Sequence, residues 1–175
     1  FGADNNPNSI NQFVKKYLNS FDALSVREQS GVKILNDNSV NDVDVVCDPV
    51  FLLDENCWIN IARKPVENMP GKYILYYALR KDEKLIRAAK KVGKDYGIPV
   101  FSIHPNGNRS FMIENQLHKV GPKEFVWLIK NAAYICTNSF HAVAFSSIFK
   151  KKVVFYGYEN GKGRVESLLS ILKSP

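Results

Sequence analysis

The chain has 175 residues, of which 45% are hydrophobic and 23% charged, with three cysteines and a formal net charge of +7. A chain of this length buries enough surface to form a core, so it needs neither disulfide bonds nor a structural metal. No stretch reaches the ~20 apolar residues of a membrane-spanning helix, and no secretory signal is visible, so we expect a globular, cytoplasmic protein.

The first third of the chain predicts alternating helices and strands. A helix follows a cap at Asn8 or Ser9 and runs to Phe21, because its apolar residues recur at steps of three and four. The later elements are a strand at 23–28, a helix through Leu35, a buried strand at 43–47 that ends in Asp48-Pro49, and a connector at 50–64. Because the sequence starts without methionine and enters structure at once, we expect the polypeptide to be part of a longer one.

Beyond Pro70-Gly71 the alternation becomes regular. The expected elements are strand 73–79, helix 82–96, strand 99–103, loop 104–110, strand 111–113, a helix from Pro122 through 129, strand 134–137, helix 140–149, strand 152–156 and a helix through 165–172. This spacing is typical of parallel strands joined by right-handed crossovers. We therefore predict an α/β fold with a Rossmann-like parallel sheet flanked by helices. Residues 1–66 would end an incomplete amino-terminal domain with its connector, and residues 67–175 would form a carboxyl-terminal Rossmann-like domain.

The charged and sulfur-containing residues indicate neither nucleic-acid binding nor a metal site. The basic segment 81–94 also contains Asp82 and Glu83 and has no aromatic residue for base stacking, so we interpret it as a solvated helix face. Lysines 150–152 are interpreted as the end of a helix, where cations complement the helix dipole. Cys47 and Cys136 lie in apolar runs, and Cys57 has no histidine at ligand spacing, so we expect reduced cysteines, no metal and no cofactor.

The most informative segment is the turn Thr137-Asn138-Ser139-Phe140-His141, which closes an apolar strand and opens an apolar helix. Ligands of parallel sheets bind at the carboxyl ends of the strands. Asn138 or Ser139 would cap the helix, whose first amides and dipole favour a phosphate or carboxylate. His141 could add a proton donor, although a buried cap beside a core histidine is the structural alternative.

Further cations follow in the segment 157–164, which we expect to be a glycine-containing loop before the last helix. Lys162 and Arg164 could contact phosphate or carboxylate from this loop. Arg27, at the end of its strand, is a third candidate anion ligand, or else part of a surface ion pair.

A carboxylate could complete the site. Glu124 lies in the first turn of the helix that begins at Pro122, where it either complements the helix dipole or accepts hydrogen bonds from sugar hydroxyls. His104 could line the same cleft from its loop. Since the sequence has no Gly-x-Ser-x-Gly elbow, nucleophilic hydrolase chemistry has little support.

Taken in order, several strings resemble the polysaccharide pyruvyl transferase family. They are Phe1-Gly2, Ser25-Val26-Arg27-Glu28, Asp48-Pro49-Val50-Phe51-Leu52-Leu53 with Trp58, Tyr73-Ile74-Leu75-Tyr76-Tyr77, Gly121-Pro122-Lys123-Glu124-Phe125, Thr137-Asn138-Ser139-Phe140-His141-Ala142 and residues 164–169. Each string is weak alone, but together and in this order they are specific. The resemblance covers nearly the whole chain and implies the carboxyl-terminal portion of a protein with a GT-B-like fold, so the cleft of this portion alone would be incomplete and this fragment alone could be inactive.

The resemblance implies transfer of pyruvate from phosphoenolpyruvate to sugar hydroxyls as a ketal, in the synthesis of cell-surface polysaccharides. His141 matches the family's histidine and would be the general acid. Arg27, Lys162, Arg164 and the Asn138-Ser139 turn would bind the donor, and Glu124 would contact a sugar. The acceptor would be a sugar or a lipid-linked oligosaccharide, and a lipid-linked acceptor would bring the protein to a membrane surface.

Two other functions fit the same residues. A GT-B glycosyltransferase would use the helix N-terminus to bind the diphosphate of a nucleotide sugar. A noncatalytic glycan- or anion-binding module would bind many anions with a steep salt dependence and would not need His141.

Overall fold

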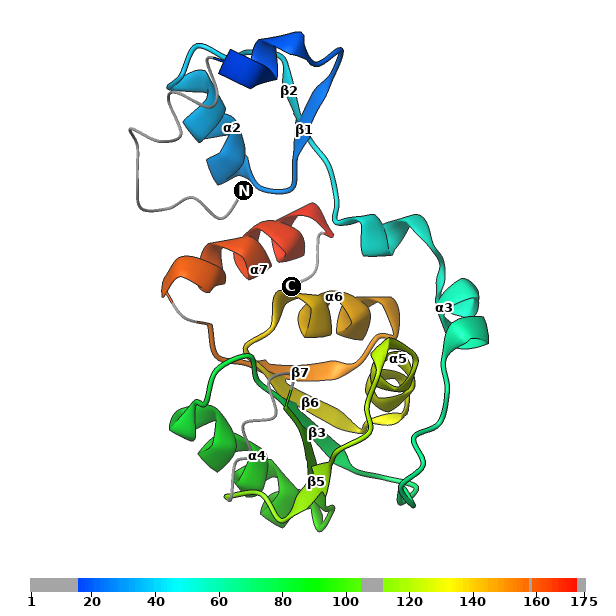
Figure 1. The fold of residues 1–175 in the computed structure, drawn as a ribbon. Coiled ribbons are helices and arrows are strands. Elements are labelled where there is room, and N and C mark those ends of the chain that lie inside the picture. The colour runs from blue at the N-terminus through cyan, green and yellow to red at the C-terminus, as the bar shows by residue number, and fades with distance from the viewer. Residues whose placement is uncertain (1–15, 105–111, 158, 173–175) are drawn as a thin grey trace. The chain divides into compact units, whose positions relative to one another are not determined.

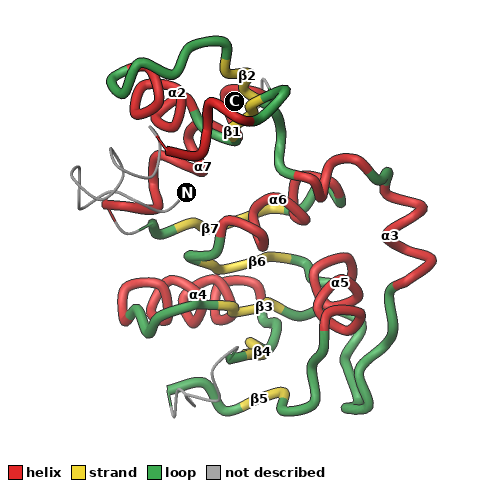
Figure 2. The backbone as a smooth tube through the Cα atoms, turned by 45° about the horizontal axis from the view of Figure 1, so that its top comes forward, coloured by secondary structure: helices red, strands yellow, loops and turns green. Residues whose placement is uncertain are grey.

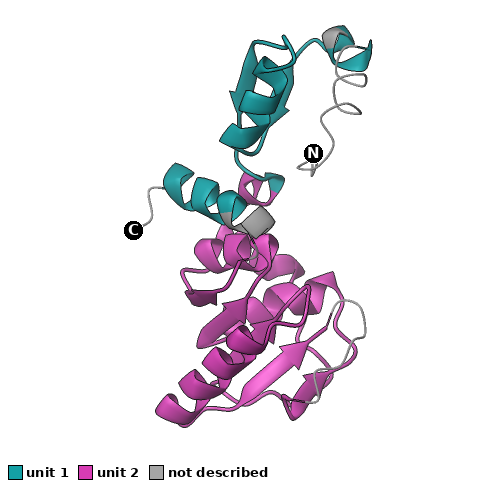
Figure 3. Ribbon diagram, turned by 90° about the vertical axis from the view of Figure 1, so that its left-hand side faces the viewer, with its two compact units in different colours: residues 1–49, 163–175 teal, residues 50–162 magenta. Residues whose placement is uncertain are grey.

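The computed structural model describes residues 16–104, 112–157 and 159–172 (Figure 1). Of the first expected helix, residues 8–15 lie outside this range, and a short 3-10 helix, η1 (Leu18–Ser20), follows them. The chain divides into two compact units (Figure 3). Unit 1 comprises residues 1–49 and 163–175, and unit 2 comprises residues 50–162.

Unit 1 contains one parallel β-α-β arrangement, as the sequence predicts. Strands β1 (Leu24–Val26) and β2 (Val43–Val45) pair in parallel, and α2 (Gln29–Asn36) connects them. Leu18, Leu35 and Val40 form a small buried cluster beneath them. The expected strand at 43–47 is shorter than predicted and partly exposed rather than buried, because β2 has only β1 as a neighbour.

Unit 2 is built on a five-stranded, fully parallel sheet. Its strands are β3 (Ile74–Tyr77), β4 (Val100–Ile103), β5 (Asn115–Leu117), β6 (Tyr134–Thr137) and β7 (Lys152–Phe155). Figure 2 shows them side by side in the order β5-β4-β3-β6-β7. This order, with crossovers on both sides of a central β3, confirms the predicted Rossmann-like sheet.

Helices cover both faces of the sheet (Figure 1). On one face α4 (Glu83–Tyr96) packs against Ile74, Tyr76 and Cys136. On the other face α5 (Pro122–Asn131) and α6 (Phe140–Ile148) pack against Tyr73 and Leu75. Because successive side chains of a strand point to opposite faces, the unbroken apolar run of β3 can fill both cores.

The expected connector at residues 50–64 is wrong, because this segment folds onto unit 2. It forms the 3-10 helix η2 (Pro49–Leu52) and helix α3 (Glu55–Ile61), whose cap Asp54 accepts a hydrogen bond from the Cys57 amide at 2.8 Å. The Trp58 ring meets Phe145 edge-on at 4.8 Å between centroids. These contacts explain why the break between the units falls after Pro49, whereas the sequence suggested a boundary at residue 66.

Two further expectations differ from the structure. The strand expected at 111–113 is instead β5 at 115–117, with Phe111 outside the described residues. The sequence does not predict β5 because this edge strand has only one inward apolar residue, Leu117, and so shows no alternating pattern. The expected loop at 157–164 is also wrong, since α7 (Glu159–Ile171) already begins at Glu159. Within the described residues, no helix combines the length and the apolar character that crossing a membrane requires.

Helices α4 and α6 end in the same hydrogen-bonded cap but with different residues at its left-handed position. In α4 the Ile98 amide donates to the Gly93 carbonyl at 3.0 Å, and Gly97 has φ +65. In α6 the Lys151 amide donates to the Ser146 carbonyl at 2.8 Å, and Lys150 has φ 51. Glycine adopts this conformation without steric cost, whereas a lysine does not.

We therefore expect Lys150→Gly to stabilise the protein. Glycine removes the steric cost of the left-handed backbone, but it also increases the entropy of the unfolded chain. The net effect should raise the free energy of unfolding by about 0.5–1 kcal/mol. The matched change Gly97→Lys should lower it by about 1 kcal/mol. Urea unfolding of both variants measures the effect, and an unchanged midpoint in both would contradict the argument.

Candidate functional site

The turn after β6 is fastened to the end of β3 by buried hydrogen bonds. Thr137 lies opposite Tyr77 in the register, and its hydroxyl donates to the Tyr77 carbonyl at 2.6 Å. The same hydroxyl oxygen accepts a hydrogen bond from the Ser139 amide at 3.0 Å. Thr137 is completely buried. The central strand β3 and its neighbour β6 are therefore joined at their carboxyl ends.

Asn138 extends this connection to the turn between β3 and α4. Its side-chain oxygen accepts from the Leu79 amide at 2.8 Å, and its side-chain nitrogen donates to the Arg80 carbonyl at 3.0 Å. A buried amide that uses both ends in this way orients the loop it bonds. Asn138 thus holds residues 79–80 at the carboxyl edge of the sheet, while its expected contact with a substrate stays a prediction.

Ser139 is the cap of α6. Its hydroxyl oxygen accepts a hydrogen bond from the Ala142 amide at 3.4 Å, and its carbonyl accepts from the Val143 amide at 3.2 Å. Ser139 is buried, whereas His141, two residues further, is exposed. The His141 ring lies 5.5 Å from the Phe140 ring, edge to face. This exposure excludes the alternative of a core histidine and leaves His141 accessible in the first turn of the helix.

Glu124 is held inside unit 2 by two partners. One carboxylate oxygen accepts from the Gly121 amide at 3.0 Å, which caps α5, and the other pairs with the Arg63 guanidinium. The hydrogen bond from Arg63, together with those from backbone amides, lowers the pKa of Glu124 against the opposing effect of burial. These contacts favour the helix-capping interpretation of Glu124, and its expected contact with a sugar stays a prediction.

In unit 1, two of the predicted cations are paired with carboxylates. Arg27 pairs with the buried Asp48, and the Arg164 Nε atom lies 3.5 Å from a carboxylate oxygen of Glu28. Because Arg27 and Glu28 are consecutive, the fold brings the two arginines to the same strand end. Lys162 belongs to the early part of α7, and its side chain lies outside the described residues.

Two histidines lie at the ends of neighbouring strands. His104 directly follows β4, and His118 directly follows β5. Burial lowers the pKa of His104, and the positive charge of His118 lowers it further. Both effects favour the neutral form of the His104 imidazole.

The sequence does not predict the carboxylate and the arginine that orient these candidates. Asp48 reads only as the end of a strand, and Arg63 belongs to no motif, because both ion pairs join residues far apart in the chain. Parallel pairing of β1 and β2 was the one signal that could have linked Arg27 to Asp48. Across residues 16–104, 112–157 and 159–172, no group of three or more histidine, cysteine or acidic residues could hold a metal ion.

Comparisons with known proteins agree with this architecture. The family model described as polysaccharide pyruvyl transferase matches residues 1–160. No curated protein matches the chain. Among solved structures, the chain is similar to UDP-N-acetylglucosamine 2-epimerase from Rickettsia bellii, with a TM-score of 0.55 and 11% identity over 87% of this chain and 51% of that chain. The UDP-GlcNAc 2-epimerase of Methanocaldococcus jannaschii, in complex with UDP-GlcNAc and UDP, gives a TM-score of 0.48 and 13% identity over 87% and 55%.

The chain therefore spans about half the length of these solved structures. The likeness to the Rickettsia bellii protein concerns the fold alone and confirms the expected GT-B-like α/β architecture.

We expect Asn138→Ala to loosen the carboxyl edge of the sheet. Loss of two hydrogen bonds at a buried position should lower the free energy of unfolding by about 1–2 kcal/mol. The control is Asn131→Ala on the exposed end of α5, where one side-chain bond to the Trp127 carbonyl is lost and the change should stay within about 0.5 kcal/mol. Urea unfolding compares the two variants, and equal effects would refute the orienting role of Asn138.

Proposed function

Since this chain belongs to the polysaccharide pyruvyl transferase family, we propose that it takes part in transferring pyruvate from phosphoenolpyruvate to two hydroxyls of a sugar, forming a ketal. The acceptor in this proposal is a sugar of a cell-surface polysaccharide or a lipid-linked oligosaccharide. The proposed reaction takes place in the cytoplasm and, with a lipid-linked acceptor, at a membrane surface. No resident cofactor is required, because the donor itself supplies the reactive carbon.

The observation that carries the proposal is the exposed His141 in the first turn of α6, directly after a buried cap. The partial positive charge of a helix N-terminus favours a bound phosphate or carboxylate, and phosphoenolpyruvate has both groups. An accessible imidazole beside that anion suits a general acid. The buried hydrogen bonds of Thr137 and Asn138 fix the backbone from which His141 projects, so its position is maintained without a substrate.

The proposed chemistry needs one acid and a place for the leaving phosphate. His141 protonates the methylene carbon of the donor, and the electron pair of its double bond forms the new C–H bond. The resulting oxocarbenium-like carbon is attacked by one sugar hydroxyl. This hydroxyl returns its proton to the His141 imidazole. The C–O bond to phosphate then breaks with its electron pair leaving on the phosphate, the second hydroxyl attacks the same carbon, and its proton passes to the departing phosphate as the ketal closes. A positioned general acid typically contributes a factor of about 10² to 10⁴ in rate.

Arg27, Arg164 and Lys162 are the cations that we propose for the donor's phosphate and carboxylate. Asp48 and Glu28 hold the two arginines in the folded protein before any donor binds. Guanidinium groups have several donors, so an arginine that keeps one carboxylate partner can still bind a second anion. We propose Asn138 and Ser139 as donor-binding residues through the turn that they shape, and Glu124 as a sugar-facing residue of the same unit as His141.

The test of His141 measures the turnover rate of the full-length protein. His141→Ala should reduce turnover by about 10²-fold or more, because it removes the acid, and should leave the melting temperature nearly unchanged, because the side chain is exposed. His118→Ala, at an exposed position after β5, is the control and should retain turnover. Phosphate release and thermal melting measure both effects, and full turnover of His141→Ala would refute the assignment.

The binding test titrates phosphoenolpyruvate calorimetrically, with a uridine-diphosphate sugar as the competing donor. Arg27→Ala should weaken phosphoenolpyruvate binding about tenfold or more. Since this change alone leaves the buried Asp48 without its arginine, the double variant Arg27→Ala/Asp48→Asn serves to separate binding from stability. Arg87→Ala on α4, which removes an exposed pair with Glu83, is the control. Tight binding of the nucleotide sugar, with none of phosphoenolpyruvate, would instead support a nucleotide-sugar glycosyltransferase.

A further inference from the structure

A charged cavity lies in unit 2 at the amino ends of the strands, the edge of the sheet opposite to the turn of Asn138 and His141. It has a volume of about 460 Å³, and its lining comes from the starts of four elements. Tyr134 is the first residue of β6, Lys152 is the first of β7, and Lys72 and Ile98 lie two residues before β3 and β4. Such a volume suits an organic ligand rather than a single ion.

The lining is cationic. Lys72, Lys150, Lys151 and Lys152 line the cavity, and no aspartate or glutamate does. The ion pairs that the structure shows among its described residues include none of these four lysines. The nearby Asp95 is already bonded to Lys91, at 2.6 Å between its carboxylate and the ammonium nitrogen. Four cations around one cavity repel each other, and a bound anion would relieve that repulsion.

Lys150 and Lys151 occupy positions that are unfavourable for a lysine. Lys150 occupies the left-handed end of α6, with φ 51, where a glycine would be unstrained. Burial lowers the pKa of Lys151, and the charge of Lys130 lowers it further against the effect of Glu55. The backbone therefore disfavours a side chain at Lys150, and burial disfavours the charge of Lys151. Strain of this kind is commonly found at binding sites.

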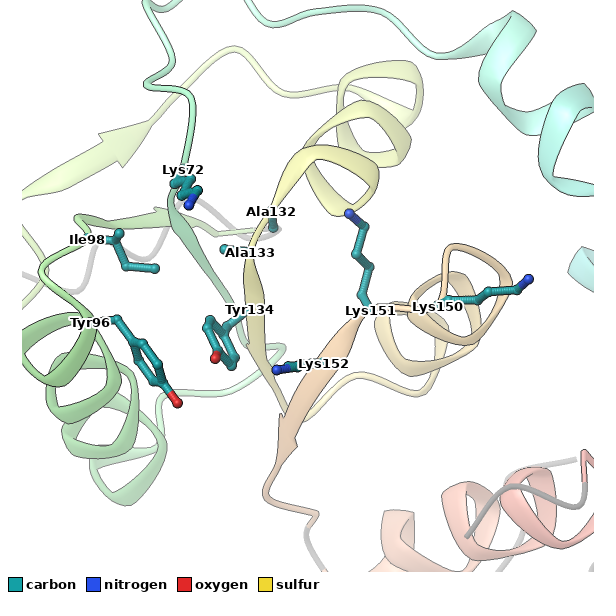
Figure 4. A pocket seen from close by; sticks show the side chains of 9 residues that line it. All are labelled: Lys72, Tyr96, Ile98, Ala132, Ala133, Tyr134, Lys150, Lys151 and Lys152. Carbon is teal, nitrogen blue, oxygen red and sulfur yellow. The ribbon is translucent and has the colours of Figure 1, made fainter.

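Two tyrosines give the cavity an aromatic wall (Figure 4). The Tyr96 and Tyr134 rings lie 5.0 Å apart between centroids with 31° between their planes. The Lys152 ammonium lies 5.5 Å from the centre of the Tyr134 ring, whereas Lys150 extends away from the tyrosines. Hydrogen bonding to Tyr134 raises the pKa of Tyr96, so its hydroxyl stays protonated. The wall thus offers a flat apolar face and hydroxyl donors beside a cation.

We propose that this cavity binds a phosphate-bearing organic molecule, with its phosphate on Lys72 and Lys152 and its organic part against the two tyrosines. Lysine ammonium groups bind phosphate as point charges. The source of the phosphate is either a soluble phosphorylated compound or the headgroup of an anionic lipid. The proposal concerns a different edge of the sheet and does not depend on the pyruvyl transfer described above.

The test compares two double variants with the same change in net charge. Lys72→Gln/Lys152→Gln removes two exposed lysines of the cavity, and Lys84→Gln/Lys90→Gln removes two exposed lysines of α4 that do not line it. Inorganic pyrophosphate is titrated calorimetrically for the soluble source. Co-sedimentation with phosphatidylglycerol vesicles, and with phosphatidylcholine vesicles as a blank, probes the lipid source. Thermal melting checks that each variant is folded.

We expect the cavity variant to bind at least one probe about tenfold or more weakly than the wild type, and the α4 variant to bind it as the wild type does. Loss of pyrophosphate binding identifies the soluble source, and loss of vesicle binding identifies the lipid headgroup. The proposal is overturned if the wild type binds neither probe, or if both double variants bind alike. It is also overturned if pyrophosphate binding disappears in Arg27→Ala but persists in Lys72→Gln/Lys152→Gln, because the anion then occupies the proposed donor site.

Discussion

The fastening of β6 to β3 is the constraint on which the carboxyl edge of unit 2 depends. β3 is the central strand of the sheet and β6 is its neighbour, and each is followed by a helix whose start faces the same edge. Thr137 joins the strand ends, Asn138 joins the turns that follow them, and Ser139 starts α6. The polar residues of this segment are buried and bonded within the protein, while the next polar residue, His141, is exposed. One short sequence thus supplies both the buried support and the exposed imidazole.

Charge is organised differently at the two edges of unit 2 and within unit 1. At the carboxyl edge, the buried Glu124 is satisfied by Arg63 and the Gly121 amide. In unit 1, Arg27 and Arg164 each have a carboxylate partner. At the amino edge, by contrast, lysines line a cavity without a carboxylate. The arginines are thus oriented by carboxylates within the fold, whereas the lysines concentrate positive charge at one edge of the sheet.

The sequence predicts most of the sheet because local patterns determine it. The apolar run of β3, the Asp82 cap and the Pro122 start are signals within a few residues. The misses have a different origin. Edge strand β5 carries only one inward apolar residue, α3 is amphipathic over only seven residues, and α7 begins through two glycines that local rules assign to a loop. The ion pairs Arg27–Asp48 and Arg63–Glu124 depend on tertiary structure, so no local sequence pattern predicts them.

The bond between Asn138 and Leu79 spans 59 residues of sequence. Contacts of such long range form late, because the intervening chain must first be ordered. During synthesis on the ribosome, β3, α4 and β4 can emerge and pair before β6 exists. The bonds from Asn138 to residues 79–80 can therefore form only once β6 has joined β3. An ordered His141 turn thus reports that two strands made far apart in the sequence have already paired.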